Sequence, residues 1–466
     1  MNETQTETII AIATPPGEGG IGILRLSGPR SEAILTKVFR RAGNPTTPWE
    51  SHRLTYGFLQ EGDLILDEGM AVLMRAPRSY TREDVAEIQL HGGSYVLQKG
   101  MELCLNQGAR MAAPGEFTRR AFLNGRIDLS RAEAVMSLIA ARGEQEHRAA
   151  IREMEGGVTA FVRGAADKLY EIQAGLAACV DYPEEISEEE GAAEMIPRLE
   201  SLIALLEESI QERGSRLLHQ GLRVALIGRP NVGKSSLLNA LLGEEKAIVT
   251  PIPGTTRDLV QGEMTLGGVR VQITDTAGVR ETQDEVEKIG VERSRRAMAE
   301  ADVTLLALDG SQPLQKEDQD LIASLPEQAA ILINKQDLPQ QIALPGQADI
   351  LPNKQDLPQQ ITLPETGHRL IPCSAKNPET LRPVKDYLRE FTALSDQMAV
   401  TQPRHLDALK RAVAFLKLAL ETVQTLPPDL AATDLQAAQQ ALGEITGDQV
   451  DEKLLDKVFS SFCVGK

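Results

Sequence analysis

A glycine-rich stretch between an apolar run and a helix-forming run constrains this chain more than any other feature. The stretch is Gly228-Arg-Pro-Asn-Val-Gly-Lys-Ser-Ser236; it follows the apolar run Leu222–Ile227 and leads into Leu237–Leu242. A G-x-x-x-x-G-K-[ST] match between a strand and a helix predicts a phosphate-binding loop whose backbone N–H groups point at phosphate oxygens. We expect Lys234 to reach the β- and γ-phosphates and the Ser235 hydroxyl to bind Mg²⁺.

Two motifs downstream of this loop offer further contacts for Mg²⁺ and the γ-phosphate. Gly254-Thr-Thr-Arg-Asp258 supplies a threonine hydroxyl, and we assign the contact with Mg²⁺ to Thr256. Asp275-Thr-Ala-Gly278 follows the strand-like run 269–274. Its aspartate can hold the metal through water, and its last N–H can contact the γ-phosphate.

Two later motifs are suited to reading the base. Asn334-Lys-Gln-Asp337 ends the strand-like run 330–333, and its carboxylate can accept hydrogen bonds from the N1–H and the exocyclic amine of guanine. Adenine lacks both donors and would leave the carboxylate unpaired, which is a strong penalty. Ser374-Ala-Lys376 follows Leu370–Cys373, where a backbone N–H can meet the guanine oxygen. Five motifs in this order predict a GTPase, and Asp337 disfavours an ATPase.

The base-reading motif occurs twice. Residues 334–345 recur as residues 353–364 with a single substitution, which indicates a local duplication that lengthened a loop. The second copy follows a poorer strand because Pro352 cannot donate a hydrogen bond to a ladder. We therefore assign the base contact to Asp337 rather than to Asp356.

The catalytic water needs a positioning group other than the usual glutamine. Val279 follows Asp275-Thr-Ala-Gly278 where many small GTPases carry that glutamine, and the acidic stretch 281–287 supplies carboxylates instead. Asn231 offers a neutral oxygen that can bind a monovalent cation, which would stabilise charge developing between the β- and γ-phosphates. Capping of the following turn is an equally good role for Asn231.

Composition limits the class of partner. The 466 residues carry 49 Lys+Arg and 67 Asp+Glu, a net charge of −18, so bulk electrostatics alone would not hold nucleic acid. If RNA is the substrate, a partner or a local basic patch must help to hold it. The four cysteines form no C-x-x-C pair, which suggests neither a disulfide framework nor a zinc site and fits a reducing compartment. No apolar run approaches the ~18 residues that span a bilayer, and residues 1–7 are unlike a signal peptide. We expect a cytoplasmic protein.

Changes in pattern along the chain predict three folding parts. Residues 1–125 show strand-like runs at 8–13, 21–26, 54–58 and 68–74 and helices over 31–40 and 96–107, as in an α+β domain. Residues 126–219 and 383–466 are rich in Ala and Leu with a period near 3.6, which predicts helices. Residues 220–382 alternate strands and helices, which is typical of a doubly wound parallel sheet. We expect an all-α domain in two segments with an α/β P-loop GTPase (Ras-like G) domain inserted between them.

The chain also resembles a known family along essentially its whole length. In the G domain the matching motifs are the phosphate loop, Thr250-Pro-Ile-Pro-Gly-Thr-Thr-Arg-Asp258, Asp275-Thr-Ala-Gly278 and Asp284-Glu-Val-Glu-Lys-Ile-Gly290. Outside it they are Ala13-Thr-Pro-Pro-Gly17, Gly20-Ile-Gly-Ile-Leu-Arg25, Leu90-His-Gly-Gly93, Pro114-Gly-Glu-Phe-Thr118, Arg120-Ala-Phe-Leu-Asn124, Gly443-Glu-Ile-Thr-Gly447 and Phe462-Cys-Val-Gly-Lys466. The motifs outside the G domain are far more specific than the shared GTPase motifs. By these residues the chain resembles the MnmE/TrmE tRNA modification GTPases.

The resemblance implies a protein that works with partners. Its N-terminal domain would bind tetrahydrofolate and hold a homodimer together. A flavoprotein with bound FAD, MnmG/GidA, would join it in a heterotetramer that acts on tRNA. Together they would add an aminomethyl or carboxymethylaminomethyl group to C5 of the wobble uridine. The carbon would come from 5,10-methylenetetrahydrofolate, of which 5-formyltetrahydrofolate is an analogue. Hydrolysis of GTP would be activated when two G domains meet across bound K⁺.

The resemblance also implies a set of site residues. Catalytic roles fall to Lys234, to Glu287, which would orient water, and to Cys463. K⁺ would be bound by Asn231 and by backbone oxygens near Thr250, Ile252 and Thr255. Pro251 stands where family members often carry Asp, which matters little if only backbone oxygens coordinate. The residues expected to contact GTP are Asn231, Val232, Gly233, Lys234, Ser235, Ser236, Thr250, Pro251, Ile252, Pro253, Gly254, Thr255, Thr256, Asp275, Thr276, Ala277, Gly278, Asn334, Lys335, Asp337, Ser374 and Ala375.

Folate contacts are implied at Arg25, Glu83, Arg126 and Lys466. Guanidinium groups suit the carboxylates of a folate tail, and a carboxylate suits the donors of a pterin ring. Ordinary surface salt bridges are the alternative for these residues. Cys463 can instead be a small buried residue beside Phe462. It also has the spacing of a prenylation box, although Gly465 and a final Lys466 make a poor one.

A second class of function stays open at this point. The chain can be a ribosome-assembly GTPase whose output is a conformational state rather than chemistry on RNA. That function predicts an RNA-binding module with clustered Lys and Arg, and no such cluster is visible near either end of the sequence. Binding of a folate separates the two hypotheses.

Overall fold

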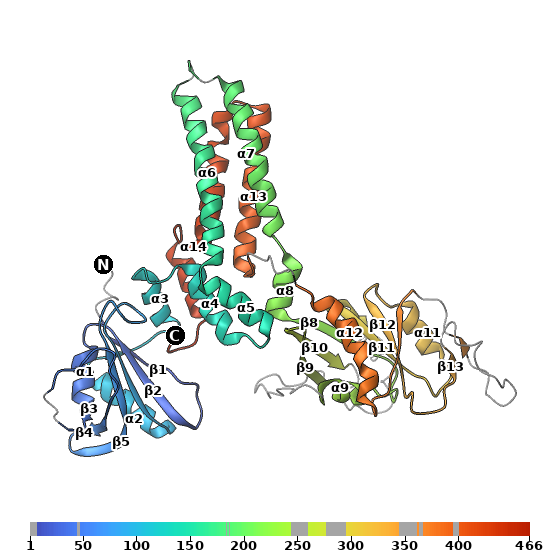
Figure 1. The fold of residues 1–466 in the computed structure, drawn as a ribbon, viewed down its shortest axis with the longest axis horizontal. Helices are drawn as coiled ribbons and strands as arrows, with labels where there is room; N and C mark the ends of the chain where they lie inside the picture. Colours follow the sequence, from blue (N-terminus) through green and yellow to red (C-terminus); the bar gives the residue numbers. More distant parts are fainter. Residues whose placement is uncertain are drawn as a thin grey trace. The chain divides into compact units, whose positions relative to one another are not determined.

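A computed structural model describes residues 7–43, 47–182, 184–185, 187–243, 260–275, 295–343, 361–362, 367–394 and 400–466. The chain forms two compact units, drawn in Figure 1. Unit 1 comprises Met1–Ile139, Ala150–Glu207 and Asp407–Lys466, and unit 2 comprises Ala140–Ala149 and Glu208–Leu406. Unit 2 is therefore an insertion in unit 1, which confirms the expected order of an α+β part and a helical part interrupted by an α/β part.

The N-terminal part of unit 1 is built on a seven-stranded sheet with the strand order β3-β4-β5-β6-β2-β1-β7. The strands are β1 (Ile9–Ile12), β2 (Gly19–Ser27), β3 (Phe39–Arg41), β4 (Thr55–Glu61), β5 (Leu64–Met74), β6 (Val85–Gly92) and β7 (Arg110–Met111). All described pairs are antiparallel except β1 with β7. The helices α1 (Ser31–Val38) and α2 (Ser94–Asn106) contact each other and pack on β1, β2 and β6.

Two differences from the expected elements have local causes. The predicted helix over 31–40 ends at Val38 because Phe39 adopts an extended backbone and begins β3, which pairs with β4. The central strand β6 is absent from the sequence-based prediction, although buried Ala86, Ile88 and Leu90 alternate with more polar residues along it. That period-2 pattern is the signal that could have identified the strand.

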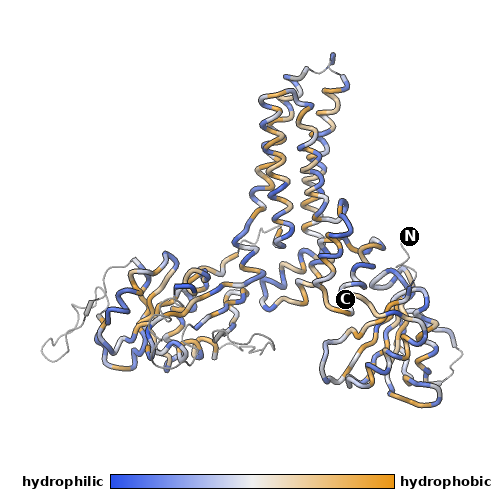
Figure 2. The backbone as a smooth tube through the Cα atoms, turned by 180° about the vertical axis from the view of Figure 1, so that it is seen from behind, coloured by the Kyte–Doolittle hydropathy of each residue, from blue (hydrophilic) through white to orange (hydrophobic). Residues whose placement is uncertain are grey.

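Long helices make up the rest of unit 1. They are α3 (Glu116–Leu123), α4 (Leu129–Ala140), the C-terminal part of α5 (Glu144–Met154), α6 (Gly157–Asp181), most of α7 (Glu188–Ser209), most of α13 (Pro403–Thr425), α14 (Ala432–Thr446) and α15 (Glu452–Ser460), with the short 3-10 helix η3 (Pro428–Ala431). Buried residues recur every three or four positions along α6, as at Val162, Ala165, Leu169 and Ile172. Hydrophobic and hydrophilic residues accordingly alternate along the tubes of these helices in Figure 2. Helix α6 packs against α14, and Lys417 pairs with Glu207 at 2.6 Å.

Unit 2 is a six-stranded sheet with helices on both faces. The strand order is β15-β12-β11-β8-β10-β9, and every described pair is parallel except β9 with β10. The strands are β8 (Leu222–Ile227), β9 (Val260–Leu266), β10 (Val269–Asp275), β11 (Val303–Asp309), β12 (Ala329–Asn334) and β15 (Arg369–Pro372). The helices are α8 (Glu212–Gln220), α9 (Lys234–Gly243), α11 (Lys316–Ala323) and α12 (Arg382–Thr392), with η2 (Pro378–Leu381) before α12.

The two faces of this sheet have separate hydrophobic cores. Val224 and Leu226 of β8 pack with residues of α9 and α12, whereas Ala225 and Ile227 pack on the other face with Ile322 of α11. Helix α12 lies within unit 2, so the nucleotide-binding part continues past residue 382 in the structure. The duplicated segments also meet, because β13 (Ile342–Ala343) pairs in parallel with its equivalent β14 (Ile361–Thr362). The loops that follow the parallel strands lie at one edge of the sheet, where a nucleotide site is expected.

Candidate functional site

The phosphate loop joins β8 to α9 through residues whose backbone demands glycine. Gly228 has φ 141° and Gly233 has φ 98°, and a Cβ on either would collide with a neighbour, the Ala307 carbonyl oxygen or the Asn334 amide nitrogen. Asn231 between them also has a positive φ, 65°, and is exposed. The loop therefore lies tightly against the ends of β11 and β12, and its curl leaves N–H groups for an anion.

Lys234 and Ser235 lie where a phosphate and a metal would be held. Lys234 is buried, and its ammonium donates to the carbonyl oxygens of Gly228 and Arg229 at 2.7 and 2.8 Å. Burial lowers the pKa of Lys234, although the nearby Asp275 opposes that shift. Ser235 Oγ donates to Asp275 Oδ2 at 2.7 Å. Mg²⁺ binds oxygen ligands such as hydroxyl and carboxylate groups, so Ser235 and Asp275 fit that metal.

Asn334 ties the base-reading motif to the phosphate loop. It is 2% exposed, its amide donates to the Val232 carbonyl oxygen at 2.8 Å, and its side-chain oxygen accepts from the Ala375 N–H at 3.2 Å. One buried side chain thus fixes three loops at the carboxyl ends of the strands. Gly233 directly precedes α9 and Ser236 lies in its first turn, so both are placed by the same loop–helix junction.

Lys335 makes a second link between the loops. It has φ 64°, and its ammonium contacts Asp309 Oδ2 at 2.6 Å and the Asn231 carbonyl oxygen at 3.1 Å. Burial disfavours the charged form of Asp309, but hydrogen bonds from Lys335 and Ser311 outweigh it and lower the pKa of the carboxyl. Sequence reasoning missed Asp309, which its place at the end of β11 could have indicated.

Asp337 faces the last motif. Ser374 Oγ donates to Asp337 Oδ1 at 2.7 Å, and Lys376 Nζ lies 3.0 Å from Oδ2. These two contacts, the Ser374 hydrogen bond first, lower the pKa of Asp337 and keep it an acceptor. The structure thus brings Asp337, Ser374 and Ala375 together, while Asp356 lies outside the described residues.

Several expected site residues also lie outside the described residues. They are Thr250, Pro251, Ile252, Pro253, Gly254, Thr255, Thr256, Thr276, Ala277, Gly278 and Glu287. Of the K⁺ ligands implied by the resemblance, the structure therefore describes Asn231 alone.

A second group of candidates meets in unit 1, where the C-terminal tail lies on the N-terminal sheet. Arg25 donates through Nη1 to the Gly465 carbonyl oxygen at 3.1 Å and pairs through Nε with Glu87 at 2.7 Å. The Phe117 N–H donates to the Lys466 carbonyl oxygen at 3.2 Å. Gly465 has φ 96°, and a Cβ there would lie 2.7 Å from the Ile12 carbonyl oxygen. The tail thus approaches β1 too closely for any other residue.

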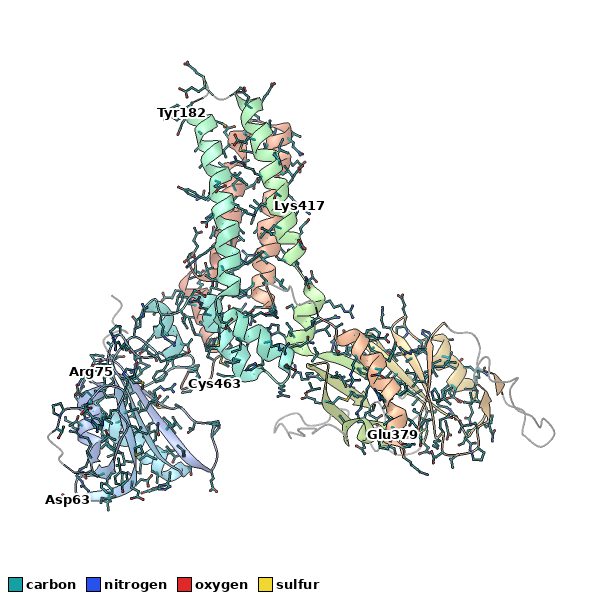
Figure 3. All side chains as sticks on the ribbon, in the orientation of Figure 1. Asp63, Arg75, Tyr182, Glu379, Lys417 and Cys463 are labelled. Atoms are coloured by element: carbon teal, nitrogen blue, oxygen red, sulfur yellow. The ribbon has the colours of Figure 1, made fainter. Side chains whose placement is uncertain are left out.

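This docking leaves Cys463 at the surface. The Cys463 carbonyl oxygen accepts from the Gly115 N–H at 3.4 Å, while its side chain is exposed (Figure 3). The alternative of a buried core cysteine is therefore wrong, since Phe462 takes the buried position. Cys463 stays a candidate for chemistry in an accessible place.

Glu83 is held by buried partners. Ser27 Oγ donates to Glu83 Oε2 at 2.6 Å, and Arg120 Nη1 lies 3.0 Å from the same oxygen. Arg120 is 3% exposed and also reaches Glu116 at 2.9 Å. Arg120 begins one of the family motifs in the sequence, but no role was predicted for it. Its signal was the i, i+4 spacing from Glu116.

Arg126 is the most exposed of the four folate candidates. Its guanidinium lies over the Tyr80 ring, 4.6 Å from the centroid. The donor set of Arg25, Arg126, Lys466 and Glu83 offers cations for carboxylates and a fixed carboxylate for N–H donors, which fits a folate.

Comparison with known proteins places this chain in a family. The family model described as the MnmE helical domain matches residues 129–463, and the one described as the GTP-binding protein TrmE N-terminus matches residues 8–126. Among solved structures, an Era protein from Aquifex aeolicus bound to GDP and AlF4⁻ is 25% identical in sequence. The match covers 42% of this chain and 67% of that one, with a TM-score of 0.26.

Curated relatives match over almost the full length of the chain. The tRNA modification GTPase MnmE of Heliobacterium modesticaldum is 43% identical over 99% of both chains. That of Lactiplantibacillus plantarum is 41% identical over 99% of both chains. No helix in the described ranges is long and apolar enough to cross a membrane. The chain belongs to the family of the tRNA modification GTPases named MnmE.

Proposed function

We propose that this chain hydrolyses GTP to drive modification of C5 of the wobble uridine in certain tRNAs. Its product is an aminomethyl or carboxymethylaminomethyl uridine, and its partner is an FAD-dependent protein of the MnmG/GidA type. The working form is a cytoplasmic homodimer held by the N-terminal domains, in a heterotetramer with the partner. The proposal is supported most by one observation, the docking of the Cys463–Lys466 tail beside Arg25 in a chain that also carries a guanine-nucleotide site.

In unit 2 the described site residues each contribute to the binding of GTP. Asp337 accepts from the N1–H and amine of guanine, and Ser374 keeps its carboxylate aligned. Lys234 exchanges its contacts with Gly228 and Arg229 for phosphate oxygens. Ser235 and Asp275 hold Mg²⁺, which would neutralise charge on the β- and γ-phosphates.

Hydrolysis needs groups beyond these. Thr256 completes the Mg²⁺ shell in this proposal, and Glu287 orients the attacking water. Asn231 would hold K⁺ together with backbone oxygens of Thr250, Ile252 and Thr255, and the cation would supply positive charge that activates hydrolysis when two G domains meet. A positive charge between the β- and γ-phosphates stabilises the transition state as an arginine finger does.

In unit 1 the tail and the sheet form the site for the one-carbon donor. Methylenetetrahydrofolate supplies a one-carbon unit when bound. Arg25, Arg126 and Lys466 bind its carboxylates, and Glu83 accepts from its pterin ring. Cys463 is exposed and takes part in the chemistry on the uridine.

Calorimetric titration of 5-formyltetrahydrofolate into the purified chain tests this function. The native protein should bind, and Arg25→Ala should lose binding because it removes both the cation and the contact with Gly465. Arg40→Ala is the matched control, since Arg40 is exposed on the same sheet and bonds Gln60 instead. A folded native protein that binds no folate would exclude the folate-dependent chemistry and leave a GTPase whose N-terminal domain has another role.

A second measurement addresses the GTPase half. Turnover of GTP should be faster in KCl than in NaCl, and Asn231→Ala should remove the difference. Equal turnover in the two salts would contradict the assigned role of Asn231.

A further inference from the structure

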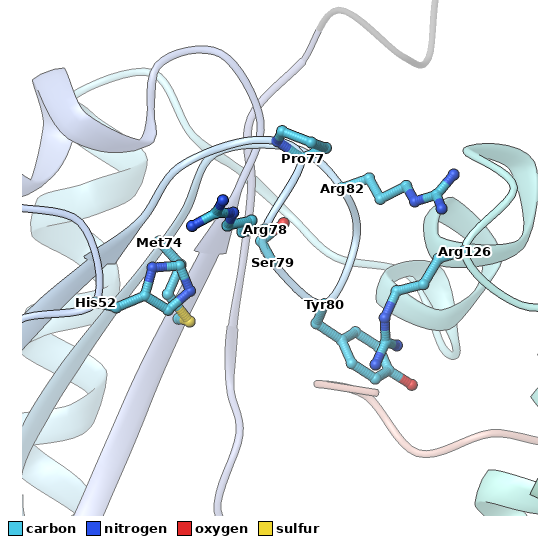
Figure 4. Close-up of a pocket in the computed structure, with 8 residues that line it drawn as sticks. All are labelled: His52, Met74, Pro77, Arg78, Ser79, Tyr80, Arg82 and Arg126. Atoms are coloured by element: carbon cyan, nitrogen blue, oxygen red, sulfur yellow. The ribbon is translucent and has the colours of Figure 1, made fainter.

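A hollow of about 530 Å³ opens on the surface of the N-terminal domain in unit 1 (Figure 4). It is lined by His52, Met74, Pro77, Arg78, Ser79, Tyr80, Arg82 and Arg126. Three of these side chains are guanidinium groups and a fourth is an imidazole, while none is a carboxylate. The hollow is thus a concentrated basic surface on a chain whose net charge is −18.

The guanidinium groups of the hollow are not neutralised. Within the ranges that the structure describes, no carboxylate pairs with Arg78, Arg82 or Arg126. Arg75, three residues before Arg78, instead makes a bidentate contact with Glu32 at 2.8 Å. Arg82 donates to the Asn124 carbonyl oxygen at 2.9 Å, and Arg126 lies over Tyr80. These contacts hold both side chains in place and leave their charges available.

The backbone around the hollow is also unusual. His52 has φ 64° and Arg82 has φ 60°, a region that residues other than glycine seldom adopt. Among the described residues, the other two such positions are Asn231 and Lys335, both in the nucleotide site. Strain of this kind gathers where a ligand is held, and here it fixes two basic residues on the wall of the hollow.

The hollow gathers residues that are far apart in the sequence. Its guanidinium groups come from two separate segments, at residues 78 and 82 and at residue 126, and His52 comes from a third. The fold brings them together, and Arg126 belongs as well to the candidate folate site. The hollow therefore adjoins the place where, under the proposed function, a uridine must be presented.

We propose that this hollow binds the sugar–phosphate backbone of the substrate RNA beside the modified nucleotide. Phosphate groups are the anions that arginine forks bind in pairs, and each contact made releases counterions from the RNA. On an acidic chain, a local surface of this kind can hold a polyanion that the net charge would repel. The open form of the hollow suits a strand that lies across it.

A competing occupant is the carboxylate-bearing tail of a folate. It would share Arg126 and would also be drawn to guanidinium groups. The spread of guanidinium groups over two segments and the wide opening favour a strand of phosphates over a single flexible tail. This inference rests on the proposed function, because it assumes that RNA is the substrate.

Fluorescence anisotropy with a labelled RNA stem-loop and the full chain tests the inference. Arg78→Glu should weaken binding about tenfold and lower the slope of log affinity against log salt by about one or two. Arg82→Gln should weaken it about five- to tenfold. Arg53→Glu is the matched control, since Arg53 is exposed in the same domain but already pairs with Glu50 at 2.7 Å, and it should change little.

Three outcomes would overturn the proposal. One is a native chain that does not bind the stem-loop at low salt. Another is Arg78→Glu binding RNA as tightly and with the same salt slope as Arg53→Glu. The last is Arg78→Glu retaining RNA affinity but losing preference for a pteroyl-polyglutamate over the monoglutamate, which would assign the hollow to the folate tail. Thermal unfolding of each variant confirms that unit 1 is folded, and titration of 5-formyltetrahydrofolate reports on the folate site separately. A native chain that binds RNA but no folate would remove the proposed modification chemistry and leave the RNA surface standing.

Discussion

The nucleotide site in unit 2 and the tail site in unit 1 are assembled by different means. In unit 2, Asn334, Asp337 and Ser374 reach one place because each follows a parallel strand, and parallel strands end at one edge. In unit 1, Arg25 meets Gly465 although they lie 440 residues apart. Short motifs therefore suffice to locate the first site, whereas the second exists only when the C-terminal tail docks.

This difference indicates which substitutions should disrupt each site. The nucleotide site is crosslinked by buried side chains such as Asn334, so single contacts can be changed without losing the loops. The tail site depends on the close approach of one glycine and on a buried charge network around Arg120. Substitutions at Arg120 or Gly465 should therefore act through structure, and substitutions at Asp337 through the ligand.

The largest effect is expected on GTP affinity when the base-reading carboxylate, Asp337, is substituted. Asp337→Asn should lower GTP affinity about a thousandfold, because two hydrogen bonds to a charged acceptor are lost. Xanthosine triphosphate, which has a carbonyl in place of the guanine amine, should regain affinity for this variant. Asp356→Asn is the matched control from the duplicated motif and should bind GTP normally. Titration with a fluorescent nucleotide measures both, and a reversed result would assign the base contact to Asp356.

The next effect is on stability. Arg120→Met should destabilise unit 1 by about 3 kcal/mol, because Glu83 and Glu116 would keep their charges without their buried partner. Thermal unfolding followed by calorimetry measures the loss, with Arg119→Met, whose side chain is a third exposed, as the control. Folate affinity should fall as well, while GTP binding by unit 2 should not. Equal unfolding temperatures for the two variants would show that the network contributes nothing.

A smaller effect is expected at the tail. Gly465→Ala should weaken folate binding about tenfold, since the left-handed backbone and the approach to the Ile12 carbonyl oxygen both disfavour a Cβ. Val464→Ala, at a side chain that is 50% exposed, is the control and should bind as the native chain does. Calorimetry with 5-formyltetrahydrofolate decides between them. Unchanged affinity in Gly465→Ala would mean that the docked tail does not form the folate site.

The smallest effect is a change in acid sensitivity. Burial opposes the charged form of Glu116, but hydrogen bonds from Arg110, the Ala113 N–H and Arg120 outweigh it and lower the pKa of the carboxyl. Because the folded pKa lies below the unfolded one, Glu116 stabilises the fold above the unfolded pKa, and this stability is lost as pH falls through the folded pKa. Between roughly pH 5 and pH 3, Glu116→Gln should lose less stability than the native chain does. Parallel denaturation curves across that range would contradict the assignment.

The sequence alone determined the fold class, and it predicted the residues of the candidate nucleotide site. The phosphate loop, Asp275, Asn334 and Ser374 are each read from a strand followed by a short motif, because local pattern specifies both the strand and the loop after it. The assignment of Asp337 over Asp356 also came from a local feature, the proline before the second copy. Roles for residues in loops outside the described ranges, such as Glu287, stay predictions.

Tertiary structure alone decided what lies far apart in the chain. The pairing of Arg25 with Gly465, the burial of Arg120 against Glu83, and the gathering of Arg78, Arg82 and Arg126 around one hollow follow from how the sheet, α3 and the tail pack. Local pattern cannot predict such contacts, since the side chains meet only after the loops between them close. The exposure of Cys463 was decided in the same way, because Phe462 beside it fills the buried position.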